Sequence, residues 1–152
     1  MKKFELTSEF VTFLGKKLFR IKALVAFGGV KEGELGGFVE KEENLDQSGN
    51  AWVYGNARVS GNAWVSGDAW VSGDARVQCC RDYSAASCFG SENRTTTFFR
   101  TKDDGIGVRC GCFYGTLEEF REKVKERHGD SRLAKEYLML ADAMEFRLSK
   151  DE

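Results

Sequence analysis

The chain has little of what several functional classes require. Its 152 residues include one histidine and no proline, and no apolar run is long enough to span a bilayer. A single histidine excludes a metal site built from three histidine ligands. The first residues, MKKFELTSEF, lack the apolar core of a signal peptide, so we expect a cytoplasmic protein.

Charge of one sign is not in excess either. The sequence has 23 lysines and arginines against 24 aspartates and glutamates, for a formal net charge of −1, and both signs are interspersed. Duplex nucleic acid and membrane surfaces usually select a strongly basic face. We therefore expect neither as a partner.

Cysteines are few and odd in number. The five are Cys79, Cys80, Cys88, Cys110 and Cys112. An odd count argues against a closed disulfide framework, and the C-C and C-x-C spacings differ from the C-x-x-C of structural zinc sites. We expect no cofactor, and neither a metal nor a disulfide to be needed for folding. A zinc site with His128 as its nitrogen ligand is the less favoured alternative.

What the sequence does contain is a strict repeat. Residues 49–77, GNAWVYGNARVSGNAWVSGDAWVSGDARV, repeat a six-residue unit five times, with glycine, Asn or Asp, alanine and valine at fixed positions. Such hexads suit a three-sided parallel β-helix with one hexad per side and about eighteen residues per coil. Alanine and valine, two apart, would then point inward.

The pattern aliphatic-x-x-x-small-x in residues 53–75 resembles that of the hexapeptide-repeat left-handed β-helix family. We assign residues 39–78 to such a β-helix, with an array of surface hairpins as the less favoured alternative. The repeat is short, and the open ends of its coils must be capped or paired. Residues 1–38, with strands expected near 4–14 and 17–24, are interpreted as an N-terminal β cap.

The eighteen-residue interval predicts which outward side chains lie above one another. Trp52 should lie above Trp70 and Arg58 above Arg76, with Trp64 on the third face. Exposed aromatic patches usually mark a contact with another domain or subunit. We therefore predict a homo-oligomer that uses Trp52, Trp64 and Trp70. The alternative is that the chain's own terminal segments cover these tryptophans.

Beyond the repeat the composition changes. Residues 79–94 are interpreted as a polar connector, and residues 95–152 as a ββαα ligand-binding module. Its hairpin should turn at Asp104-Gly105, and T-L-E-E at 116–119 should cap a helix that ends at Gly129. Asp130 or Ser131 should cap a second helix. The expected fold class is mainly β with C-terminal helices: a short parallel (left-handed) β-helix plus this module.

A two-residue turn would place Arg100 opposite Arg109, beside Phe98 and Phe113. Two guanidinium groups next to aromatic rings form a cradle for a small planar anion such as a nucleotide. In the alternative, glutamates of the helices or of a partner chain neutralise both arginines. For His128 we favour a helix-end role supported by the helix dipole.

Residues 89–137 contain a Gly-Ser-x-Asn turn, C-G-C-F, G-T-L-E-E-F and K-E-x-H-G. In this combination they resemble the type 1 anti-Thoeris sponges of phages and prophages, which hold cyclic ADP-ribose isomers between a β-sheet and C-terminal helices without degrading them. The resemblance implies a viral anti-defence protein without catalytic residues. It would sequester a cyclic nucleotide, either a cyclic ADP-ribose isomer or a cyclic dinucleotide, in the infected bacterial host.

The candidate ligand-binding residues come from this resemblance and from the hairpin argument. They are Ser91, Asn93, Arg94, Arg100, Arg109, Phe113, Arg132 and Lys135. Two other functions stay open. One is an acyltransferase-like enzyme of the hexapeptide-repeat type, which would need a histidine as general base, although His128 lies outside the repeat. The other is a structural phage protein that inhibits a host protein.

Overall fold

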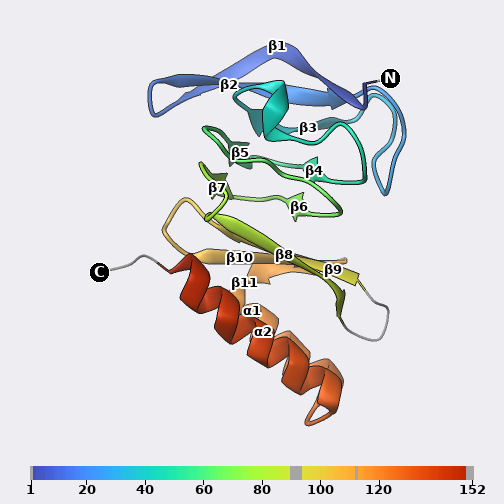
Figure 1. Ribbon diagram of the computed structural model, residues 1–152, viewed down its shortest axis with the longest axis vertical. Coiled ribbons are helices and arrows are strands. Elements are labelled where there is room, and N and C mark those ends of the chain that lie inside the picture. The colour runs from blue at the N-terminus through green and yellow to red at the C-terminus, as the bar shows by residue number, and fades with distance from the viewer. Residues whose placement is uncertain (1, 90–93, 112, 150–152) are drawn as a thin grey trace.

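The computed structural model describes residues 2–89, 94–111 and 113–149. Within these residues the protein is mainly β with two C-terminal helices, as the sequence predicts. Figure 1 shows, in order, a hairpin with a stack of short strands, an antiparallel sheet and a pair of helices. No helix among the described residues has the length and apolar character needed to cross a membrane.

The N-terminal residues form an antiparallel hairpin. Strands β1 (Phe4–Phe13) and β2 (Lys16–Ala23) are joined by Leu14 and Gly15, both with positive φ (51° and 78°). Positive φ at both central residues is typical of the tight turn that matches the twist of a hairpin. The third strand, β3 (Leu35–Val39), pairs antiparallel with β2. The two expected strands are thus confirmed.

The repeat forms short strands that pair in parallel. They are β4 (Trp52–Val53), β5 (Arg58–Val59), β6 (Trp70–Val71) and β7 (Arg76–Val77). Trp52 pairs with Trp70 and Arg58 with Arg76, so the eighteen-residue interval is confirmed between these strands. Strands β5 and β7 also continue the sheet of β1, β2 and β3, which is therefore mixed. Residues 35–77 are called the parallel stack below.

The interior of the parallel stack consists of the predicted alanines and valines. Ala51, Ala57, Ala63, Ala69, Ala75, Val53, Val59, Val65, Val71 and Val77 are all buried. The five repeat glycines, Gly49, Gly55, Gly61, Gly67 and Gly73, have φ between 63° and 72°. Glycine adopts this left-handed region without the steric cost that a side chain brings. Identical corners therefore turn the chain in the same way at each hexad.

A buried side chain joins two segments of the parallel stack. The 3-10 turn η1 (Glu42–Asn44) ends at Asn44, which is fully buried. Its side-chain amide donates to the carbonyls of Gly61 and Ala63 at 3.3 and 2.9 Å. Its Oδ1 accepts from the backbone N–H of Lys41 at 3.0 Å. Asn44 thereby satisfies backbone groups of two successive turns of chain.

Trp52 does not point to solvent as expected. It is fully buried, with its ring edge-on to Phe27 at 5.2 Å, and a Cβ atom on Gly36 would approach its ring to 2.7 Å. The segment between β2 and β3 covers the indole, because burial removes a large apolar area from water. The proposed interface of three exposed tryptophans is thus wrong for Trp52. Trp70 is half-buried, and Trp64 is 52% exposed.

The C-terminal sheet has four strands rather than the expected two. They are β8 (Tyr83–Phe89), β9 (Arg94–Arg100), β10 (Ile106–Cys110) and β11 (Phe113–Thr116), in the order β11-β10-β9-β8. Strand β8 lies in the stretch interpreted as a connector. Its small serine and alanine side chains give a weak strand signal, and pairing with β9 fixes its conformation.

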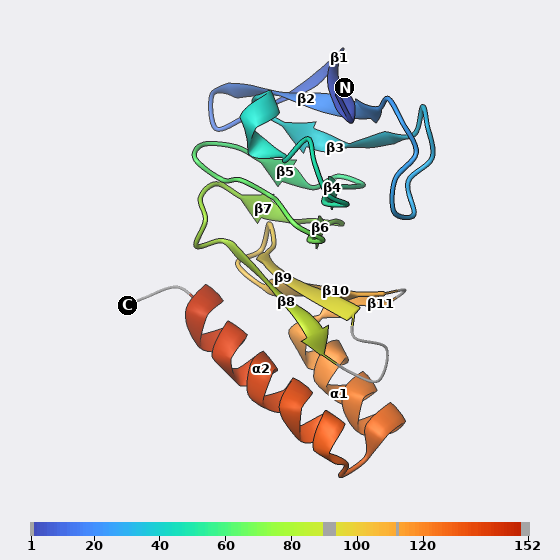
Figure 2. The same ribbon diagram turned by 45° about the vertical axis from the view of Figure 1, so that its right-hand side comes forward.

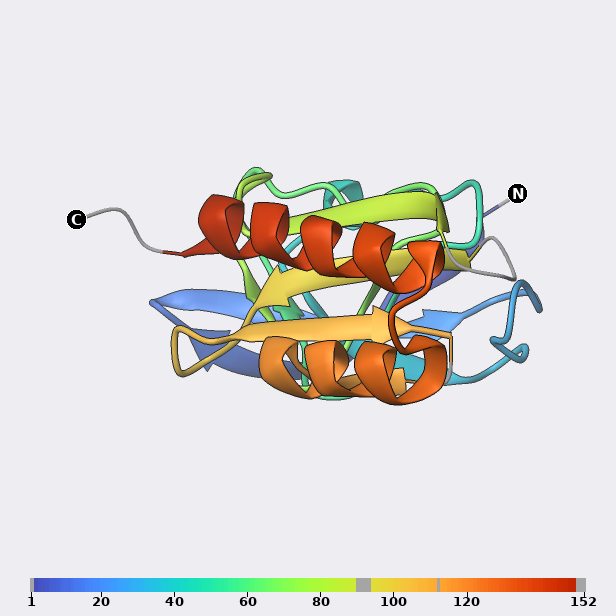
Figure 3. The ribbon, with the colours of Figure 1, turned by 90° about the horizontal axis from the view of Figure 1, so that it is seen from below.

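Both helices begin where the sequence predicts, and the first also ends there. Helix α1 (Leu117–His128) starts with a capping box in which Thr116 Oγ1 accepts from Glu119 N (3.1 Å) and Glu119 Oε1 accepts from Thr116 N (2.8 Å). Gly129 is its C-cap, and Ser131 caps α2 (Arg132–Leu148). Figures 2 and 3 show both helices on one face of the sheet, opposite the parallel stack.

The other face of the sheet closes the end of the parallel stack. Trp70 N donates to Thr97 Oγ1 at 3.0 Å, and Lys102 N donates to the carbonyl of Asp74 at 3.0 Å. Tyr114 OH accepts from Asp74 N at 3.3 Å. The last strands of the parallel stack would otherwise expose unpaired backbone groups, and these contacts satisfy part of them. The C-terminal sheet is thus a second cap, opposite the N-terminal hairpin.

Candidate functional site

A cavity of about 500 Å³ lies between the C-terminal sheet and the helices. Its lining residues are Arg94, Cys110, Phe113, Tyr114, Phe120, Lys123, Val124, Arg127, His128 and Tyr137. Cavities that hold small organic ligands usually measure about 300 to 1,000 Å³. This cavity therefore has the size of a site for one small molecule.

One wall of the cavity is aromatic. Phe120 lies at its centre, with the ring of Phe113 at 5.9 Å and the ring of Tyr137 edge-on at 5.5 Å. His128 stacks on Tyr137 at 6.1 Å with an interplanar angle of 26°. Flat ring faces of this kind bind planar bases by stacking. The wall is rigid because its rings pack against one another and against buried Phe98.

The other wall is basic. Arg94 comes from the start of β9, and Lys123, Arg127 and His128 come from the C-terminal half of α1. Among the described residues that line the cavity there is no aspartate or glutamate. Lys123 has an exposed partner, Glu126, at 3.9 Å. The charged side chains of the described lining are therefore basic and favour an anion, above all one that arginine can bind through two oxygens.

The periodicity of α1 explains how the two walls meet. Phe120 and Val124, four residues apart, are buried against the sheet. Lys123 and Arg127 precede Val124 and His128 by one residue each, so they lie at the border of the buried stripe. Lysine, arginine and histidine are also favoured in the last turn of a helix by its dipole. His128 therefore has the expected helix-end position and lines the cavity as well.

Tyr137 brings a hydroxyl group to the aromatic wall. Its OH lies 3.9 Å from Cys110 Sγ, which also accepts a hydrogen bond from Thr96 Oγ1 at 3.2 Å. Burial, and then the neighbouring Cys110, raises the pKa of Tyr137 to about 12. The hydroxyl accordingly stays protonated in the alkaline range in which an exposed tyrosine ionises.

The cysteines do not gather into a cluster in the part of the chain that the structure describes. Cys79, Cys80 and Cys110 have free thiols, and the side chains of Cys88 and Cys112 lie outside the described part. No group of three or more His, Cys, Asp or Glu residues within residues 2–89, 94–111 and 113–149 is placed to hold a metal ion.

The predicted pairing of Arg100 with Arg109 is wrong. Strand β10 places Ile106 opposite Arg100 and Arg109 opposite Thr97, so the register differs by three residues from the expected one. The loop is longer than two residues, because Thr101 N donates to the Gly105 carbonyl at 3.0 Å. An odd shift moves a side chain to the other face of the sheet.

As a result the two arginines lie on opposite faces. Arg100 is on the helix side, where its Nε lies 3.4 Å from Asp82 Oδ1. Arg109 is on the side of the parallel stack, with its guanidinium 4.5 Å from the centre of the Trp70 ring. Neither lines the cavity, so the expected two-arginine cradle does not form.

The other predicted ligand-binding residues lie in different parts of the structure. Arg94 and Phe113 line the cavity, whereas Arg132 and Lys135 lie exposed on α2 and do not. The Arg132 side chain is 93% exposed and lies 3.9 Å from Glu136. Ser91 and Asn93 lie outside the described residues.

Sequence reasoning did not nominate most of the cavity. Lys123, Arg127, Phe120 and Tyr137 are not among the predicted ligand-binding residues, although all four line the cavity. A usable signal was present in α1, where two basic residues border a stripe of Phe120, Val124 and His128. No similar signal marks Tyr137, because its place in the cavity depends on how α2 packs on the sheet.

Comparison with known proteins adds no identification: a scan against protein-family models and a search of curated proteins each found no match for this chain.

Proposed function

We propose that this protein binds one small phosphate-bearing nucleotide in the cavity between the C-terminal sheet and the helices, and that it leaves the nucleotide chemically unchanged. The observation that carries this proposal is the meeting of an aromatic wall and a basic wall in one cavity of about 500 Å³. A base stacks near Phe113 and Tyr137, and phosphate oxygens meet Arg94, Lys123 and Arg127.

The resemblance to the anti-Thoeris sponges suggests the class of nucleotide. Arg94 and Phe113 were nominated by that resemblance, and both line the cavity. We infer a cyclic ADP-ribose isomer or a cyclic dinucleotide as ligand. The protein is then a phage or prophage counter-defence protein that sequesters such a signal in the cytoplasm of an infected bacterium.

A second candidate is an acyltransferase-like enzyme. It is favoured by one observation, namely that the imidazole of His128 and the thiol of Cys110 line the same cavity. A catalytic histidine is normally oriented by a third group, often a carboxylate. The described lining residues include no carboxylate, which supports the binding protein over the enzyme.

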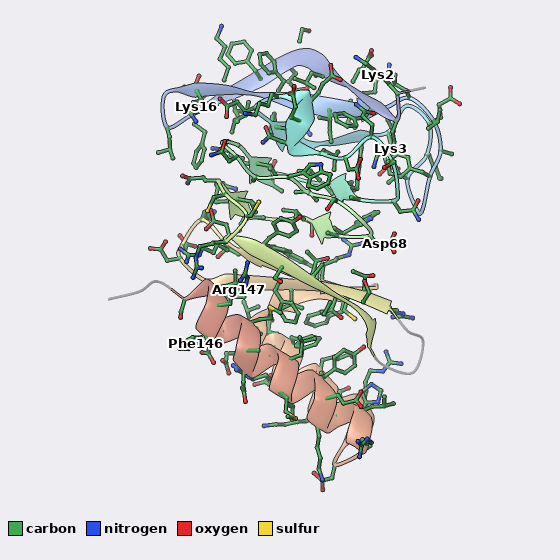
Figure 4. The ribbon with its side chains drawn as sticks, viewed as in Figure 1. Lys2, Lys3, Lys16, Asp68, Phe146 and Arg147 are labelled. Carbon is green, nitrogen blue, oxygen red and sulfur yellow. The ribbon has the colours of Figure 1, made fainter. Side chains whose placement is uncertain are left out.

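The finer fold assignment and the oligomer are also proposals. The eighteen-residue pairing of Trp52 with Trp70 and the repeated glycine corners support a short three-sided left-handed β-helix. Exposed Trp64, at 52%, and Phe146, at 86%, support a homo-oligomer. Figure 4 shows Phe146 near the C-terminal end of α2. Light scattering at tens of micromolar tests this: a monomeric wild type contradicts the oligomer.

A thermal-shift panel tests the proposed function. It contains cyclic ADP-ribose isomers, cyclic dinucleotides and linear mononucleotides. A ligand at a hundredfold excess over its dissociation constant stabilises the folded protein by about 2.7 kcal/mol. The bound nucleotide is then released by denaturation and chromatographed. Recovery of unchanged ligand supports a sponge, and an altered nucleotide contradicts it. No stabilisation by any nucleotide contradicts the nucleotide-binding protein.

A further inference from the structure

A row of side chains crosses the outer face of the mixed sheet. Arg20 pairs with Phe38, Phe38 with Arg58, and Arg58 with Arg76. Because adjacent strands lie about 4.8 Å apart, the side chains of Arg58 and Arg76 are immediate neighbours. Like charges in such cross-strand positions repel each other. This face therefore holds a like-charge pair within the parallel stack.

Phe13 holds the two guanidinium groups together. It lies at the end of β1, and its ring centre is 5.4 Å from the Arg58 guanidinium carbon and 5.8 Å from that of Arg76. The tip of this hairpin is marked by Lys16 in Figure 4 and lies on the same side of the molecule as β5 and β7. The electron-rich face of the ring attracts both cations, and this attraction holds them close despite their mutual repulsion.

Neighbouring cations on this side have acidic partners. Arg20 lies 2.9 Å from Glu9, and Lys16 lies 3.6 Å from Glu40. Within the described residues, neither Arg58 nor Arg76 forms an ion pair.

Their hydrogen bonds leave the pair incompletely satisfied. Arg76 Nη1 donates to the carbonyls of Asn56 and Ala75 at 3.2 and 2.8 Å. Arg58 Nε is buried and has no hydrogen-bond partner in the described part of the protein. Burial, followed by the charge of Arg58, lowers the pKa of Arg76, and the charges of Asp74 and Asp103 act in the opposite direction. The fold thus keeps two cations side by side, with no carboxylate of the described residues within ion-pair distance of either.

We propose that Arg58 and Arg76 form a binding site for a phosphate-class oxyanion. Each guanidinium fork can donate to two oxygens of a phosphate, and a phosphate between the forks removes their repulsion. The site is separate from the nucleotide cavity, because it lies on the parallel stack whereas the cavity lies beyond the C-terminal sheet. Its ligand is inorganic phosphate, pyrophosphate or a terminal phosphate group of a larger molecule.

The test is an NMR titration of the arginine Nε–H signals with pyrophosphate at constant ionic strength. Signals of Arg58 and Arg76, assigned by their loss in the variants, should shift saturably in the wild type. Arg58→Gln and Arg76→Gln should each weaken binding by about tenfold or more, since a hydrogen bond to a charged group is lost. Arg58→Lys should also weaken it, because lysine lacks the planar fork. Arg132→Gln, at an exposed arginine beside Glu136, should leave binding unchanged.

Arg127→Gln separates this site from the cavity. It should leave the shifts of Arg58 and Arg76 unchanged even if it abolishes binding of a nucleotide. The proposal is overturned if folded wild type shows no shift of these two signals with pyrophosphate. It is also overturned if Arg132→Gln weakens binding as much as Arg76→Gln, or if acetate shifts the signals as strongly as pyrophosphate. Because each arginine repels the other, Arg76→Gln should remain folded, as its amide spectrum will show.

Discussion

The guanidinium group of Arg94 occupies the space that a Cβ atom on Gly111 would need. Gly111 also has φ of +59°, which a side chain makes costly. Glycine at this position therefore has two roles: it allows the turn between β10 and β11, and it lets Arg94 line the cavity.

Gly111→Ala should weaken both stability and ligand binding. The left-handed backbone should cost about 1 to 2 kcal/mol of unfolding free energy, and displacement of Arg94 should weaken nucleotide binding by about tenfold. Urea unfolding and calorimetric titration measure the two effects. Gly15→Ala is the matched control, because Gly15 has φ of +78° and no atom of the described residues lies within 4 Å of the place that the added methyl group would take. Equal affinities for the two variants would show that Arg94 does not depend on Gly111.

Trp52 and Trp64 should differ sharply in their contribution to stability. Trp52 is fully buried against Phe27, whereas Trp64 is 52% exposed. Trp52→Ala should lower the free energy of unfolding by about 3 to 5 kcal/mol through the cavity that it leaves. Trp64→Ala should change it by about 0.5 kcal/mol or less in the monomer. Urea unfolding at low protein concentration measures both, and similar losses would contradict the burial of Trp52.

Arg100 and Arg109 should matter for stability and not for the ligand. Arg100→Ala leaves the nearly buried Asp82 without its ion pair, which should cost about 1 to 3 kcal/mol. Arg109→Ala removes a contact with the Trp70 ring and should cost about 0.5 to 1 kcal/mol. Calorimetric titration should give wild-type nucleotide affinity for both variants. A marked loss of affinity in Arg109→Ala would restore this arginine to the site.

Tyr137 should make stability depend on pH in the alkaline range. Its pKa is raised to about 12 in the folded protein, against about 10 in the unfolded chain. The unfolded state then loses this proton first, so the stabilisation is complete below about pH 10 and is lost as pH rises toward about 12. The loss should be about 1 to 3 kcal/mol by urea unfolding. Tyr137→Phe should lack this component, whereas Tyr54→Phe, at an exposed site, should keep it.

The strictly periodic and the locally encoded parts of the fold were predictable. Val53 and Ala57 point inward because a fixed hexad leaves them no other face, and Gly49 and its equivalents mark the corners. Thr116 and Glu119 form their capping box through groups only three residues apart. Such features depend on near neighbours, which the sequence displays directly.

Features that depend on distant contacts or on loop geometry were not predictable. Asp104 adopts φ of 61° within a loop longer than the expected two-residue turn, and this moves Arg109 to the other face. Trp52 is covered by a segment that includes Phe27, which no repeat pattern reveals. Only part of the cavity lining could be predicted from the sequence, because Arg94 and Tyr137 come together through the packing of α2 on the sheet.

Variants of the basic wall test nucleotide binding in the cavity most directly. The best nucleotide from the panel is titrated calorimetrically into wild type, into the double variant Lys123→Gln with Arg127→Gln, and into Lys125→Gln. Lys125 is the matched control, since it lies on the same helix, is exposed and does not line the cavity. We predict a loss of about tenfold or more in the double variant, wild-type affinity in the control, and recovery of the nucleotide unchanged. Equal losses in both variants, or a chemically altered nucleotide, would contradict a cavity that binds and holds its ligand.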